Sequence, residues 1–73
     1  MYFYLAKYIA LKNDIAIVED SEYLIPSNVQ IGIEQARETI YLFLTQNGHS
    51  QNVNIIISHF EEINEVTYTA LIQ

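Results

Sequence analysis

The sequence predicts a small α+β fold in which one helix packs on one face of an antiparallel sheet, with the elements in the order ββαββ. The first observation is a single segment, residues 33–48, in which apolar residues recur at the spacing of one helix face. The second concerns the segments on either side of it. They either alternate between two sets of side chains, as strands do, or are rich in aromatic and β-branched residues, and turn signals bound them. The expected helix and the expected strands also match in length, because a helix of about 15 residues and a strand of about seven both span about 22–23 Å. We therefore expect one domain that spans residues 1–73.

The first two strands are expected to form a hairpin. Residues 2–12 are rich in aromatic and apolar side chains and contain neither glycine nor proline, which predicts a strand. The pair Asn13 and Asp14 is a tight-turn signal. Residues 14–18, of which 15–18 are apolar, are therefore expected to return antiparallel to the first strand.

The charged run at residues 19–22 leaves two possibilities for the second strand. Either the strand continues past this run through a bulge to residues 23–25, or the run is itself a turn. Pro26 is expected to end the element, because proline cannot donate a hydrogen bond to a sheet.

The helix carries signals at both ends. Its apolar face is formed by residues at helical spacing, namely Ile33, Ala36, Ile40, Phe43 and Leu44. Glu34 and Glu38 near its start suit the positive end of the helix dipole, and Gly48 suits the position just past its end.

The start of the helix is open between Ser27 and Ile33. Ser27 and Gln30 have the spacing of a capping box, which would start the helix early. That start would place Gly32 inside the helix at a cost of about 1 kcal/mol. We place the start at residues 31–33.

Two more strands are expected after the helix. Residues 49–52 are expected to form a polar loop, and residues 53–60 alternate as a strand does. Residues 61–65, which include three glutamates, are expected to form a charged hairpin loop. The alternation of residues 66–72 then predicts the last strand.

The charges are expected to be uneven over this fold. The chain carries nine acidic and three basic residues, a net charge of -6, which disfavours direct binding of nucleic acid. In the expected topology both acidic segments and the helix N-terminus share one end, which gathers Glu19, Asp20, Glu22, Glu34, Glu61, Glu62 and Glu65. This acidic pole is either an ordinary solvated end, a surface that docks a basic partner protein by imitating a phosphate backbone, or a calcium-like carboxylate site. No calcium-loop spacing supports the third possibility.

The chain also has more apolar side chains than one helix can cover. Hydrophobic residues make up 51% of the sequence, and one helix shields only one face of a sheet. The other face would carry the tyrosines of the first strand or their neighbours, and the candidate interface residues are Tyr2, Tyr4, Tyr8, Phe60 and Tyr68. We expect a homo-oligomer, or a partner protein docked on this face or on an edge strand. The alternative is a mildly aromatic face left in water.

Residue types that carry chemistry are sparse in this sequence. Cysteine is absent, which excludes disulfides and thiolate metal sites, and no Gly-rich phosphate loop is present. Ser58 and His59 are neighbours on an expected strand, so their side chains point to opposite faces and cannot act as nucleophile and base. His49 is expected to be a solvated histidine. We expect a non-enzymatic, cytoplasmic protein without cofactor, metal or membrane span.

In size and composition the chain resembles the small accessory proteins of phages and prophages. The resemblance lies in a short, acidic, cysteine-free chain that is rich in Ile, Asn and Tyr, and no motif is part of it. It implies a protein that binds and blocks a host protein, such as a nuclease or another defence enzyme. The same composition suits a small structural or regulatory subunit.

Overall fold

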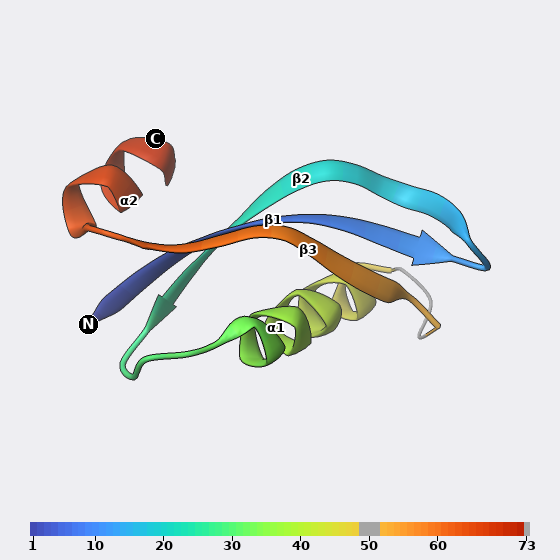
Figure 1. Cartoon of the computed structure of the whole chain (residues 1–73), viewed down its shortest axis with the longest axis horizontal. Helices are drawn as coiled ribbons and strands as arrows, with labels where there is room; N and C mark the ends of the chain where they lie inside the picture. The colour runs from blue at the N-terminus through green and yellow to red at the C-terminus, as the bar shows by residue number, and fades with distance from the viewer. Residues whose placement is uncertain (49–51, 73) are drawn as a thin grey trace.

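The computed structural model describes residues 1–48 and 52–72, which form one antiparallel sheet and two helices (Figure 1). The elements are β1 (Tyr2–Lys12), β2 (Ile15–Ser27), α1 (Ile33–Gln46), β3 (Asn54–Ile63) and α2 (Glu65–Ile72). The strand order is β2-β1-β3, so the first strand lies in the centre. Figure 1 shows α1 and α2 on opposite sides of the sheet. The α+β class and the antiparallel sheet are confirmed, whereas the order ββαββ is wrong because the last element is a helix.

The turn between β1 and β2 forms where the sequence predicts it. Asn13 and Asp14 both have positive φ, 53° and 63°, which their short polar side chains tolerate. Two such residues in succession suit a hairpin, because their backbone twist matches the twist of the flanking strands. The pairing starts with Lys12 opposite Ile15 and continues antiparallel along β1.

β2 continues through its charged run, as the first of the two possibilities requires. The register shifts between the partners of Tyr8 and Ala10, and within this interval Asp20 has a φ of 42°. A bulge of this kind accommodates an extra residue without ending the strand. Pro26 does not end β2, which runs on to Ser27. Proline is tolerated there because β2 is an edge strand and needs no hydrogen bond on its outer side.

α1 begins at Ile33, within the interval expected from the sequence. The N–H of Gly32, just before the helix, donates a hydrogen bond to Oε1 of Gln35 at 2.9 Å and closes the first turn. The earlier start is not used, because the Ser27 hydroxyl donates to the Val29 carbonyl oxygen in a local turn. Of the expected apolar face, three residues are buried and two are exposed, with Ala36, Ile40 and Leu44 inside and Ile33 and Phe43 outside.

The last element is a helix and not the strand that its alternating residues predict. Residues 66–72 have high strand propensity, but Asn64 caps a helix directly before them. Its Oδ1 accepts a hydrogen bond from the N–H of Thr67 at 2.8 Å, and its carbonyl oxygen accepts one from the N–H of Tyr68 at 3.0 Å. The hairpin loop expected at residues 61–65 is wrong for the same reason, because β3 runs to Ile63 and α2 starts two residues later.

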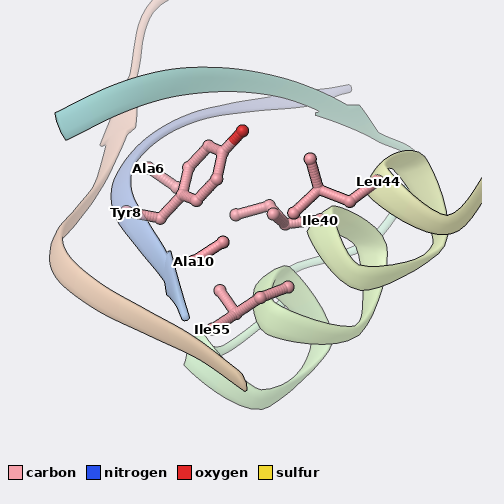
Figure 2. Close-up of a cluster of buried hydrophobic side chains, with 6 residues drawn as sticks. All are labelled: Ala6, Tyr8, Ala10, Ile40, Leu44 and Ile55. Atoms are coloured by element: carbon pink, nitrogen blue, oxygen red, sulfur yellow. The ribbon is translucent and has the colours of Figure 1, made fainter. Parts of the chain in front are cut away.

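The core lies between α1 and the face of the sheet that carries the even-numbered residues of β1 (Figure 2). Its main cluster is Ala6, Tyr8, Ala10, Ile40, Leu44 and Ile55. The two alanines of β1 are fully buried, and their small side chains let α1 approach the sheet closely. A second cluster continues the core toward the start of α1 and consists of Tyr4, Ile25 and Ala36.

Tyr8 makes the stability of this core depend on pH. Burial raises the pKa of its phenol; a hydrogen bond with the Ser21 side chain partly offsets this rise, and the nearby Tyr23 adds to it. The unfolded chain releases the same proton at an ordinary pKa of about 10. The contribution to stability is therefore complete below about pH 10 and is lost as the pH rises through the raised pKa of the folded state. We expect urea unfolding to show a free energy of unfolding that falls as the pH rises above about 10.

Tyr8→Phe is the control for this effect. The variant lacks the titrating phenol, so its free energy of unfolding should fall less over the same pH interval. Equal falls for the wild type and Tyr8→Phe would contradict the assignment.

Candidate interaction surface

α2 covers only one end of the second face of the sheet. The ring of Tyr68 lies 4.5 Å from that of Phe3, centroid to centroid, and Leu71 lines a small hollow with Leu5 and Leu24. No residue of α2 is itself buried, so this helix rests on the sheet without being enclosed. Figure 1 shows α2 near the N-terminal end of β1, with the sheet uncovered beyond it on that side.

The uncovered part of this face crosses all three strands and is mostly apolar, with the polar Asn54 beside Leu11 on β3. In the register Ile9 pairs with Ile56, and Leu11 pairs with Ala16, so these side chains share one face. We call this group the open sheet surface. Ile56 is 44% exposed, and Ile9 and Leu11 are half-buried. Single exposed apolar residues are ordinary on a protein surface, but a contiguous group of them favours a contact site.

A row formed by a lysine, a glutamate and a histidine separates the open sheet surface from the end under α2. Lys7 pairs with Glu22 on β2 and with His59 on β3. Oε1 of Glu61 lies 3.4 Å from Nε2 of His59. Lys7 is the one Lys or Arg on this face. The other lysine of β1, Lys12, is an even-numbered residue and lies on the opposite face of the strand, and the arginine lies on α1.

The two outer edges of the sheet are poorly suited to adding another strand. On β3, Nε of Arg37 donates a hydrogen bond to the Ile55 carbonyl oxygen at 3.2 Å, and the guanidinium also forms an ion pair with Glu34. On β2, the bulge at Asp20 and the missing N–H of Pro26 interrupt the edge. Obstructed edges of this kind disfavour strand-to-strand pairing between molecules. The open sheet surface is therefore the better candidate for contact.

The five aromatic residues expected to form an exposed face do not share one. Tyr4 and Tyr8 are each 3% exposed and lie beneath α1. Phe60 stacks on Tyr4 with ring centroids 5.2 Å apart, and Tyr2 packs at the margin of the same core. Tyr68 lies on α2, against the other face. Both faces of β1 are apolar in sequence, and α1 covers the face whose alanines leave room for it, which leaves the opposite face open.

The acidic side chains are likewise not gathered at one end. Residues 19–22 lie within β2 because the strand continues past them. Glu61 and Glu62 lie within β3, where successive side chains alternate between faces, and Glu65 opens α2. Glu34 pairs with the arginine of α1. All seven acids of the expected pole are exposed, but β2 and β3 carry most of them along their lengths.

A groove of about 590 Å³ lies between α1 and the start of β3. Its apolar lining includes Leu42 and Val53, and its charged lining includes Glu38. The guanidinium of Arg37 is already engaged by a carboxylate and by the β3 edge. The groove is therefore part of the junction at which α1 is held against β3.

Neither a metal-binding cluster nor a membrane-spanning helix is found in residues 1–48 and 52–72. This part of the chain holds no group of three or more His, Asp and Glu side chains that could bind a metal ion. It also contains no helix long and apolar enough to cross a membrane. His49 falls outside the described residues, so its solvated state stays a prediction.

Comparison with known proteins leaves the surface as the main guide to function. No protein-family model, no curated protein and no solved structure matches this chain. The fold defines a small α+β protein with one helix-covered sheet face and one face that is half open.

Proposed function

We propose that this chain is a non-enzymatic protein-binding module that self-associates through the open sheet surface. The observation that carries the proposal is an apolar half-face that neither helix covers, in a sheet whose edges are obstructed. Apolar surface removed from water contributes about 25 cal/mol per Å². A second copy offers the same surface, so a symmetric pair buries both copies of it at once.

Changing Ile56 to glutamate is expected to abolish self-association. Ile56 is 44% exposed in the single chain, so the substitution should leave the fold intact while placing a charge in the middle of the contact. Sedimentation equilibrium at micromolar concentrations should show a dimer for the wild type and an 8.5 kDa monomer for Ile56→Glu.

Leu42→Glu is the matched control for this variant. Leu42 is 52% exposed and lies on α1, on the other side of the sheet, so its substitution adds the same charge without touching the open sheet surface. This variant should remain a dimer. A wild-type chain that stays an 8.5 kDa monomer over a wide concentration range would overturn the proposal.

The runner-up function is an acidic inhibitor that blocks a nucleic-acid-binding host protein, as the phage resemblance implies. The exposure of all seven acids favours it, and their spread over β2, β3 and the helices weighs against it. Salt separates the two functions. Two copies with a net charge of -6 each repel one another, so added salt should strengthen self-association, whereas it should weaken capture of a basic partner. The double substitution Glu61→Lys/Glu62→Lys should impair capture of a basic partner and leave self-association unchanged.

A further inference from the structure

We infer that two copies pack antiparallel through the open sheet surface, about a two-fold axis that crosses the strands near the level of Ala10. The β1–β2 turn of each copy then lies beside α2 of the other. This inference rests on the proposed self-association and adds its geometry. Three features carry it: the position of α2, the size of the open sheet surface, and the charge at the turn.

The position of α2 decides which orientation fits. Helices and sheets both pack about 10 Å from the element they cover, so α2 occupies the layer that the partner's sheet must enter. In a parallel arrangement, α2 would overlap the matching end of the partner's sheet. In the antiparallel arrangement the β1–β2 turn of the partner lies next to α2 in the same layer and does not overlap it. Figure 1 shows α2 and the β1–β2 turn at opposite ends of the molecule, as this arrangement requires.

The size of the open sheet surface requires α2 to take part. Between Lys7 and Lys12 a strand advances about 17 Å, and three strands are about 14 Å wide, which gives a footprint of about 240 Å². A stable interface buries about 800 Å² on each partner. Further exposed apolar side chains are present on α2, where Leu71 and Ile72 are 47% and 57% exposed, and on β2 beside the turn, where Ala16 is exposed on the face of Leu11. The antiparallel arrangement brings these two groups together.

The turn carries the charge that complements Lys7. Ala10 lies midway along β1 between Lys7 and Asn13, so rotation about that level places the turn of one copy over Lys7 of the other. Asp14 is exposed at this turn. Within one copy about 23 Å of strand separates Lys7 from Asp14, so they cannot pair there. Lys7 already has Glu22 beside it in its own copy, and Asp14 adds an acid from the partner.

A charge swap tests this pairing. Lys7→Glu and Asp14→Lys are each expected to weaken the dimer by about tenfold, because each places like charges opposite one another. The double variant should return to within about threefold of the wild-type dissociation constant, because the pair is restored with its signs exchanged. Sedimentation at low ionic strength measures all four proteins. Lys12→Glu is the matched control, since it makes the same charge change on β1 with the opposite parity.

The outcomes separate this inference from the proposed function. A wild-type monomer would overturn self-association, and the antiparallel arrangement with it. A wild-type dimer whose double variant stays as weak as the single variants would overturn the arrangement alone. Asp14 has a positive φ that lysine tolerates less well, so Asp14→Asn is added as a variant that keeps the turn preference and removes the charge. It should weaken the dimer by about threefold, and an unchanged dissociation constant would count against the pairing.

Discussion

Replacing Ile40 with alanine is expected to lower the free energy of unfolding by about 2–5 kcal/mol. Ile40 has no exposed surface and is the largest fully buried side chain among the described residues. Figure 2 shows it reaching from α1 into the group formed with Tyr8 and Ala10. Truncation leaves a cavity that closely packed neighbours fill only in part. Urea unfolding followed by circular dichroism measures the loss.

Leu42→Ala is the control for the Ile40 experiment. Leu42 lies on the same helix and is 52% exposed, so its truncation removes little packing. The expected loss is below about 1 kcal/mol. Equal losses for the two variants would mean that α1 presents a different side to the sheet.

Tyr4→Ala is expected to cost about 3–5 kcal/mol of unfolding free energy, as buried aromatic truncations do. The Tyr4 side chain is 3% exposed and stacks on Phe60 with an interplanar angle of 7°. Its hydroxyl oxygen accepts a hydrogen bond from the N–H of Ile31 at 3.1 Å, which ties the segment before α1 to the sheet. Tyr4→Phe keeps the ring and loses only this hydrogen bond, so it should cost about 1 kcal/mol.

The Tyr4 variants also distinguish a core residue from an interface residue. A core residue lowers the stability of the single chain when it is truncated. An interface residue instead weakens association and leaves the unfolding of the monomer unchanged. Unchanged unfolding of Tyr4→Ala, measured in the Ile56→Glu background where the chain is expected to be monomeric, would contradict the burial of Tyr4 under α1.

The elements that could be predicted from the sequence are those whose signals are local and agree with one another. The β1–β2 turn follows from two adjacent residues that tolerate positive φ, and both have it. α1 follows from its apolar period, and Gly32 limits its start. At α2 the local signals conflict, because strand propensity across residues 66–72 competes with the cap at Asn64. The contact of Tyr68 with Phe3 also stabilises α2, and no local sequence pattern predicts this long-range contact.

The candidate site could not be predicted, because both faces of β1 are apolar in sequence. Which face α1 covers depends on size, and Ala6 and Ala10 provide the room on one side. The tyrosines of the same face then become core, and the surface left open carries Ile9 and Leu11. The sequence signal for this surface is indirect. Two small residues mark the face of β1 that a helix can approach closely, so the opposite face is the one left open once that helix is known to be α1.

The central position of β1 has a consequence for how the chain folds. β1 reaches β2 through a two-residue turn, and hairpins with such turns form within microseconds. Its other neighbour arrives much later along the chain, because Ser58 and Lys7, which share a hydrogen bond, are 51 residues apart. Until β3 docks, the inner edge of β1 stays unpaired and can capture a strand of another chain. We therefore expect docking of β3 to limit the folding rate and to end the period in which newly made chains can aggregate.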